Sequence, residues 1–244
     1  MIRSWLLVAA KPRALDSDVN ADADRLVIDL AGCESGAEQK ARETAVEFLR
    51  AGTASGRSAK LCVRIHDFAS GEAEADVAAV IPHGVSLILL PAAENGAAVQ
   101  RLDVCLSVAE VRAGLKPGRT DIVAMNGDNP SGLLQAASFY GKSSRLRGLG
   151  WDAAGLAGTL GATRQLSDDG VWCGPMVMAR STLLLTAAQC GVAAIDTVAP
   201  PCPSDQFHRL CLEARTDGFA GKMTRDSAQL SIINAVFGGD PLSR

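Results

Sequence analysis

The sequence has few aromatic residues and little excess charge of either sign. Phenylalanine, tryptophan and tyrosine make up 4% of the 244 residues, and the formal net charge is −3. Proteins that bind nucleic acid present basic surfaces, and those that bind single strands add aromatic side chains on which bases stack. Neither feature is present, so we expect no nucleic-acid partner.

Long hydrophobic runs and closely paired cysteines are also missing. No run approaches the roughly 18 apolar residues that a membrane helix needs, so we expect no membrane partner. The seven cysteines are odd in number and contain no C-x-x-C pair, which favours a reduced, cytoplasmic protein over a disulfide framework. The apolar start is short, and Lys11, Pro12 and Arg13 follow it at once, unlike a secretory leader.

What the sequence does contain is a repeated alternation of short apolar runs and helix-like stretches. Strands separated by helices must run parallel, because each helix carries the chain back across the sheet. Eight such strands in a chain of this length predict an α/β protein with one domain over residues 1–244, a (β/α)8 TIM barrel. The predicted strands are residues 4–10, 25–30, 60–65, 86–91, 121–126, 146–151, 193–198 and 220–224, and the predicted helices are 36–51, 70–80, 96–113, 131–141, 153–162, 175–190, 204–217 and 226–237.

Charged residues gather at or near the ends of these predicted strands. In a barrel the C-terminal strand ends converge on one mouth, where this fold carries its active sites. Several carboxylates at one mouth suit Mg²⁺, and an arginine there suits a substrate carboxylate that it binds through two hydrogen bonds. The residues concerned are Asp29, Arg64, Glu94, Asp128, Asp152 and Asp196.

Each of these residues also has a structural explanation. An acidic residue just after a strand is often a helix cap, which is an alternative for Asp128 and Asp152. Glu94 is a candidate cap for the helix that begins near Asn95. These alternatives stay open.

Asp29 and Arg64 have a structural alternative as well, an ion pair between neighbouring strands. Among the three histidines, His66 is the only one placed to reach the mouth, and none shows metal-ligand spacing. We predict no Ser-His-Asp or Cys-His arrangement.

Short motifs stand in order along nearly the whole chain: Arg3-Ser4-Trp5-Leu6-Leu7-Val8, Val27-Ile28-Asp29-Leu30, Val63-Arg64-Ile65, Leu89-Leu90-Pro91 with Glu94, Pro130-Ser131-Gly132, Leu149-Gly150-Trp151, Leu160-Gly161-Ala162, Ala194-Ile195-Asp196, Gly218-Phe219-Ala220-Gly221-Lys222, and Gln229 with Asn234. Together they resemble the citrate lyase beta-subunit-like proteins of the HpcH/HpaI aldolase/citrate lyase family. The resemblance implies a (β/α)8 barrel, commonly assembled as a trimer. It also implies magnesium-assisted cleavage or formation of a carbon–carbon bond in an oxo-acid or acyl-thioester substrate.

The metal-binding positions that the resemblance implies are altered. The family holds magnesium on a Glu after strand five and an Asp in a Gly-Ala-Glu-Asp stretch after strand six. The first position falls near Asp128, one carbon shorter, and the second stretch reads Asp152-Ala153-Ala154-Gly155. We therefore expect a degenerate magnesium site on Asp128 and Asp152 that is weakened or lost. The chain also ends at Arg244, short of the C-terminal extension with which many relatives reach a neighbouring active site.

Three functions remain open. The first is a divergent carbon–carbon lyase in which Arg64, Asp196 and Glu94 are catalytic, and Arg64 and Asp29 bind the small carboxylate or acyl-thioester substrate. The second is a non-catalytic barrel kept as a binding or assembly module. The third is a metal-independent lyase or hydrolase with Asp196 or Glu94 as its base. In each case the resemblance implies a homo-oligomer, a trimer.

Overall fold

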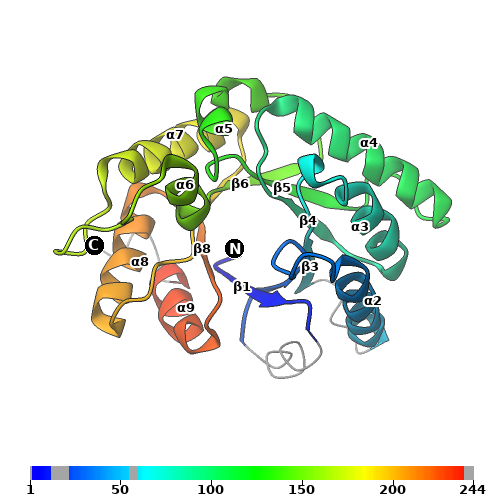
Figure 1. The fold of residues 1–244 in the computed structure, drawn as a ribbon, viewed down its shortest axis with the longest axis horizontal. Coiled ribbons are helices and arrows are strands. Elements are labelled where there is room, and N and C mark those ends of the chain that lie inside the picture. The colour runs from blue at the N-terminus through cyan, green and yellow to red at the C-terminus, as the bar shows by residue number, and fades with distance from the viewer. Residues whose placement is uncertain (1, 12–21, 55–59, 239–244) are drawn as a thin grey trace.

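The computed structural model describes residues 2–11, 22–54 and 60–238. Eight parallel strands close into a barrel in sequence order, with β8 paired to β1, so the predicted (β/α)8 fold is confirmed (Figure 1). The strands are β1 (Ser4–Ala9), β2 (Arg25–Asp29), β3 (Leu61–Arg64), β4 (Leu87–Leu90), β5 (Asp121–Met125), β6 (Leu146–Gly150), β7 (Ala193–Asp196) and β8 (Gly221–Thr224).

Helices surround the barrel, with α2, α3 and α4 on one side and α7, α8 and α9 on the other (Figure 1). The predicted helix 131–141 is divided into α5 and a 3-10 turn, η4, because the backbone leaves helical geometry at Gln135. None of the helices that the structure describes has both the length and the hydropathy needed to cross a bilayer. The elements are α2 (Glu38–Ala54), η2 (Phe68–Ser70), α3 (Ala73–Val80), η3 (Ile81–His83), α4 (Gly96–Arg112), α5 (Pro130–Leu134), η4 (Ala136–Phe139), α6 (Ala153–Leu160), α7 (Gly174–Cys190), α8 (Ser204–Asp217), η5 (Ser227–Gln229) and α9 (Leu230–Gly238).

The core has two layers, one inside the barrel and one between the barrel and its helices. Leu7 and Val27 belong to the inner cluster, whereas their strand neighbours Leu6 and Ile28 belong to the outer one. Successive side chains of a strand point to opposite faces of the sheet. The strands are therefore apolar without interruption, because both of their faces are buried.

This alternation decides where the charged strand ends point. In β2, Asp29 is two residues from the inner Val27, so it faces the interior of the barrel. In β7, Asp196 is adjacent to the inner Ile195 and faces the helices. Two aspartates at equivalent ends of strands thus lie on opposite sides of the barrel wall.

Candidate active site

A buried carboxylate lies between two arginines inside the mouth of the barrel. Asp29 is fully buried, and the register of β2 and β3 places it directly beside Arg64. Nη1 of Arg64 lies 3.1 Å from Oδ1 and 3.3 Å from Oδ2, and Nη2 of Arg225 donates to Oδ2 at 2.7 Å. The predicted Asp29–Arg64 ion pair is present. Arg225 was not predicted. It directly follows β8, however, and so lies at the C-terminal end of a strand like the charged residues that were predicted.

Arg64 remains charged because carboxylates surround it. Burial alone would lower the pKa of its guanidinium, but Asp29, Asp152 and Asp128 together raise that pKa above its ordinary value. Within the described residues, every hydrogen bond from Arg64 leaves from Nη1. Its other nitrogens are therefore available to an anionic ligand.

Asp128 presents a buried carboxylate just after β5. Its Oδ2 accepts a hydrogen bond from the backbone N–H of Ala92 at 2.8 Å, and its Oδ1 accepts one from Nδ2 of Asn129 at 3.3 Å. Burial raises the pKa of Asp128 from 3.8 to about 6; Asp152 adds to the rise, while the Ala92 N–H and Arg64 oppose it. An ionised carboxylate in this position is poorly solvated, and a cation would stabilise it. Asn129, not Asp128, caps α5, so the cap explanation for Asp128 is wrong.

The backbone that supports Asp128 has an unusual conformation. Ala92 has a φ of 48° and is the only non-glycine residue with a positive φ in the described part of the chain. Non-glycine residues rarely adopt this region, and such conformations cluster at functional sites. The hydrogen bond to Asp128 fixes the strand end of β4 against that of β5. At Gly127, a Cβ would overlap the side chain of Trp151, so glycine allows the close approach of this loop.

Glu94 lies at the rim rather than inside the mouth. Its side chain is exposed and lines a pocket of about 290 Å³ together with Asp67 and Ala92. Asn95 provides the cap of α4, since its side chain accepts hydrogen bonds from the first turn of that helix. The cap explanation for Glu94 is therefore wrong.

Asp152 caps α6 and also faces Asp128. Its Oδ1 accepts hydrogen bonds from the backbone N–H groups of Ala154 at 3.0 Å and Gly155 at 3.3 Å. A Cβ at Gly155 would lie 3.5 Å from Cγ of Asp152 and 3.6 Å from Cβ of Asp128, which is ordinary van der Waals contact. The two aspartates thus flank one point that has room for a side chain.

These donors fit a cation that takes few ligands from the protein. In the described ranges, no group of three or more His, Cys, Asp or Glu side chains is arranged to hold a metal. Magnesium is bound in proteins through one or two carboxylates, with waters and substrate oxygens completing its six positions. Asp128, with Asp152 beside it, meets that minimum and no more.

Asp196 is not brought to the mouth. It is fully buried between the barrel and the helices, and Nζ of Lys222, Nη1 of Arg180 and Nε1 of Trp151 lie 2.6, 3.3 and 2.8 Å from its carboxylate oxygens. Lys222 is its register partner on β8 and is itself fully buried. The contact with Arg180 joins the wall of the barrel to α7, whereas those with Lys222 and Trp151 join β7 to its neighbours in the wall.

One histidine contact contradicts the sequence-based expectation. Nε2 of His66 lies 3.5 Å from Sγ of Cys33, and Nδ1 of His66 lies 2.7 Å from Oδ2 of Asp76. A Cys-His arrangement therefore exists. The available signal was that Cys33 follows β2 and His66 follows β3, so both lie at C-terminal strand ends.

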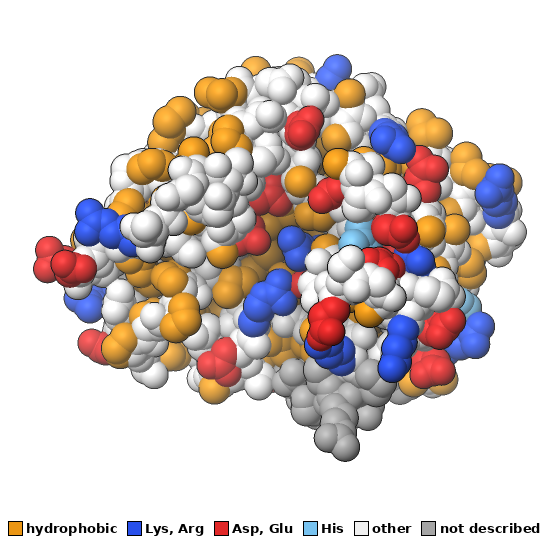
Figure 2. All heavy atoms as spheres, viewed as in Figure 1, with side chains coloured by type: hydrophobic (Ala, Val, Ile, Leu, Met, Phe, Trp, Pro, Cys, Tyr) orange, Lys and Arg blue, Asp and Glu red, His pale blue; other side chains and the backbone are white. Residues whose placement is uncertain are grey.

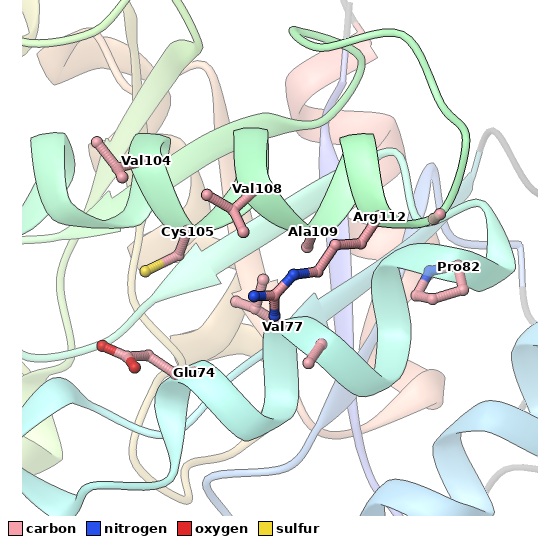
Figure 3. A pocket seen from close by; sticks show the side chains of 10 residues that line it. Glu74, Val77, Pro82, Val104, Cys105, Val108, Ala109 and Arg112 are labelled. Carbon is pink, nitrogen blue, oxygen red and sulfur yellow. The ribbon is translucent and has the colours of Figure 1, made fainter.

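The surface has further hollows. In Figure 2, side chains of both charge signs border a hollow at the centre of the barrel. Away from it, a groove of about 510 Å³ lies between α3 and α4, where Arg112 extends across towards Val77 and the side chains of Val104 and Val108 line one side (Figure 3). The mouth, not this groove, contains the clustered carboxylates and arginines.

The two roles of Asp152 can be separated by substitution. Asp152→Ala should lower the free energy of unfolding by about 1 kcal/mol, because it removes the cap of α6. Asp152→Asn should leave stability nearly unchanged, since asparagine caps equally well, while it removes the negative charge beside Asp128. Urea unfolding measures the first effect and a magnesium titration the second. Equal stability of the two variants would contradict the role of Asp152 as a cap.

Two citrate lyase beta subunits are similar in sequence to this chain. The citrate lyase beta subunit of Leuconostoc mesenteroides is 27% identical over 238 residues, which cover 96% of this chain and 76% of that protein. The citrate lyase beta subunit of Haemophilus influenzae is 26% identical over 176 residues, which cover 72% of this chain and 58% of the Haemophilus protein.

Solved structures show the same fold. RipC from Yersinia pestis is 24% identical with a TM-score of 0.77, over 99% of this chain and 97% of its own. The citrate lyase beta subunit from M. tuberculosis, in complex with oxaloacetate and magnesium, is 22% identical with a TM-score of 0.81. The match covers 97% of this chain and 96% of the M. tuberculosis chain. The family model for HpcH/HpaI aldolase/citrate lyase matches residues 3–227. The chain belongs to the HpcH/HpaI aldolase/citrate lyase family.

Proposed function

We propose that this protein is a divergent carbon–carbon lyase that acts on an oxo-acid or acyl-thioester substrate with a weakened magnesium site. The observation that carries the proposal is the buried carboxylate of Asp128, whose pKa is raised to about 6, beside Arg64 and Asp152. Perturbed ionisable groups gathered at a barrel mouth are typical of active sites. The family membership and the magnesium-bound relative support the same chemistry.

Asp128 would hold the metal in this proposal, with Asp152 beside it. When bound, magnesium would supply Lewis-acid polarisation of a substrate carbonyl. The chain itself would orient the substrate: the free nitrogens of Arg64 would bind the substrate carboxylate and stabilise negative charge that develops on the neighbouring oxygen.

The remaining candidates have different positions. Asp29 would act on the substrate through the two arginines that it aligns, since its own oxygens are already bonded to them and to the N–H of Gly32. Glu94, exposed at the rim, stays a proposed acid or base. For Asp196, a catalytic role would require the substrate to reach the helix side of the wall.

A non-catalytic barrel is the second candidate. It is favoured by Ala154 and Gly155, which offer only backbone groups at the positions where the family resemblance implies acidic side chains. The two candidates differ in whether the mouth binds magnesium together with an oxo-acid.

Gly155→Asp tests the lyase proposal. We expect this variant to bind magnesium at least about tenfold more tightly, or about 1.4 kcal/mol, because it adds a carboxylate beside Asp128. The φ of Gly155 is not in the left-handed region, and a Cβ fits there without overlap, so the new side chain should be tolerated. Isothermal calorimetry with pyruvate present measures the change.

The matched control is Gly158→Asp, one turn further along α6, where a Cβ meets nothing within 4 Å. This control adds the same charge to the same helix and should leave magnesium affinity nearly unchanged. If both variants strengthen magnesium binding equally, the added negative charge acts non-specifically and the carboxylate at position 155 is not a ligand. If neither variant binds magnesium, the non-catalytic barrel is the better proposal.

We also propose a homotrimer located in the cytoplasm, where the seven free thiols would stay reduced. Apolar side chains remain exposed on several helices, including Val104 and Val111 on α4 and Leu185 on α7. Exposed apolar surface of this kind often marks a subunit interface. Light scattering at micromolar concentration should give three times the mass of the 25.3 kDa chain. A monomer under these conditions would contradict the assembly.

A further inference from the structure

A cysteine, a histidine and an aspartate form a hydrogen-bonded chain on the rim of the barrel. Sγ of Cys33, in the segment after β2, lies 3.5 Å from Nε2 of His66, which follows β3. Nδ1 of His66 in turn lies 2.7 Å from Oδ2 of Asp76 on α3. A nucleophile, a base and a group that orients the base occur in this order in enzymes with covalent catalysis.

Asp76 sets the tautomer of the imidazole. Its carboxylate is fully buried and accepts hydrogen bonds from the backbone N–H of His66 at 2.8 Å and from Nη1 of Arg42 at 3.1 Å. Because this carboxylate already accepts hydrogen bonds from two N–H donors, it is also the acceptor in the contact with Nδ1 of His66, which carries the proton there. In the neutral imidazole Nε2 is then the acceptor, and it faces the thiol of Cys33.

The thiol is accessible from a pocket outside the mouth. Cys33 lines a hollow of about 550 Å³ together with the polar side chains of Lys11, Glu34, Lys40 and Thr44 and a set of small apolar residues. Ala10, Ala37 and Ala41 belong to that set and offer room for a short acyl chain. The pocket includes neither Asp128 nor Asp152, so a ligand there would not occupy the proposed magnesium site.

The surroundings keep the resting thiol protonated. Burial raises the pKa of Cys33 first, the carboxylates of Glu38 and Asp76 raise it further, and Arg42 opposes them. The thiolate is the reactive form of cysteine. Attack at neutral pH therefore requires that a base remove the proton as the new bond forms, and His66 is the base in contact.

We propose that Cys33 is the nucleophile of a second reactive site that takes acyl groups from thioesters, with His66 as its general base and Asp76 as a positioning residue. Sγ bonds to the carbonyl carbon while its proton passes to Nε2. The bond from that carbon to the departing sulfur breaks, and the proton leaves with the released thiol. Water then attacks acyl-Cys33 and frees the carboxylic acid and the thiol. A thioester suits this site because one sulfur displaces another of similar basicity, and no oxidant or reductant is needed.

The test uses S-phenyl thioacetate and the full, metal-free chain. Released thiophenol is followed with time, and the acetylated residue is identified by mass spectrometry of peptides. We expect one acetyl group on Cys33 and none in Cys33→Ser. The matched control is Cys202→Ser, which removes another partly buried thiol whose pKa burial raises, and which should react as the wild type does. Acetylation spread evenly over the partly buried thiols would overturn the proposal.

His66→Asn separates catalysis from a structural role. At neutral pH this variant should acetylate about 100-fold more slowly than the wild type, because general-base assistance is lost. The difference should close at pH values above the pKa of the thiol, where Cys33 ionises without a base. A rate unchanged at neutral pH, or one lowered equally at every pH, would overturn the role of His66.

Discussion

Asp128→Asn should abolish magnesium binding and, in the metal-free protein at about pH 8, raise the free energy of unfolding by about 3 kcal/mol. Asparagine can still accept the hydrogen bond from the N–H of Ala92, but it carries no charge to bind the metal or to be desolvated. Charged groups at active sites often cost stability in this way.

The pH dependence of this gain follows from the raised pKa. The carboxyl of Asp128 has a pKa of about 6 in the folded protein against an ordinary 3.8, so the folded state holds its proton more tightly. Its contribution to stability is present below the ordinary pKa and is lost as pH rises through about 6. The advantage of Asp128→Asn over wild type should therefore shrink as pH falls from about 6 towards 4. Thermal unfolding in the presence of a chelator measures it. A variant no more stable than wild type at pH 8 would contradict the buried, ionised carboxylate.

Lys222→Met should destabilise the protein by about 3–5 kcal/mol, measured by urea unfolding. Nζ of Lys222 lies 2.6 Å from Oδ2 of Asp196, and both side chains are fully buried. Removal of the lysine leaves a carboxylate in an apolar environment with one cation fewer. Arg180 remains in contact at 3.3 Å, but it also pairs with Asp217 at 2.7 Å.

The double variant Asp196→Asn with Lys222→Met provides the control. Because it removes both charges, its loss of stability should be smaller than that of Lys222→Met alone. The opposite order would mean that the carboxylate of Asp196 still stabilises the fold without the lysine, through Nη1 of Arg180 and Nε1 of Trp151, and would contradict the cost assigned to an incompletely paired buried charge.

The barrel could be predicted because its strands are buried on both faces and alternate with helices. Runs such as Leu87-Ile88-Leu89-Leu90 cannot belong to a surface strand, and their number fixed the architecture. The search for charged residues at C-terminal strand ends also selected Asp29, Arg64, Asp128 and Asp152. In the structure the three aspartates are close enough to Arg64 to raise the pKa of its guanidinium.

Position at a strand end wrongly placed Asp196 at the mouth, because that position does not determine which face of the barrel wall a side chain occupies. That direction depends on which neighbours fill the interior, and Ile195 does so in β7. The contact between Ala92 and Asp128 joins residues 36 apart in sequence and requires a positive φ at an alanine, which no local pattern indicates. The chain from Cys33 to Asp76 likewise depends on how the segments after β2 and β3 meet in space.

The role of Asp128 as a magnesium ligand can be measured by calorimetric titration of magnesium into the wild-type protein, with and without oxaloacetate. We expect saturable binding when oxaloacetate is present, much weaker binding without it, and none in Asp128→Asn under either condition. Undiminished binding in Asp128→Asn would contradict the assignment of the ligand, and no binding to either wild type or Gly155→Asp with oxaloacetate present would contradict the magnesium site as a whole.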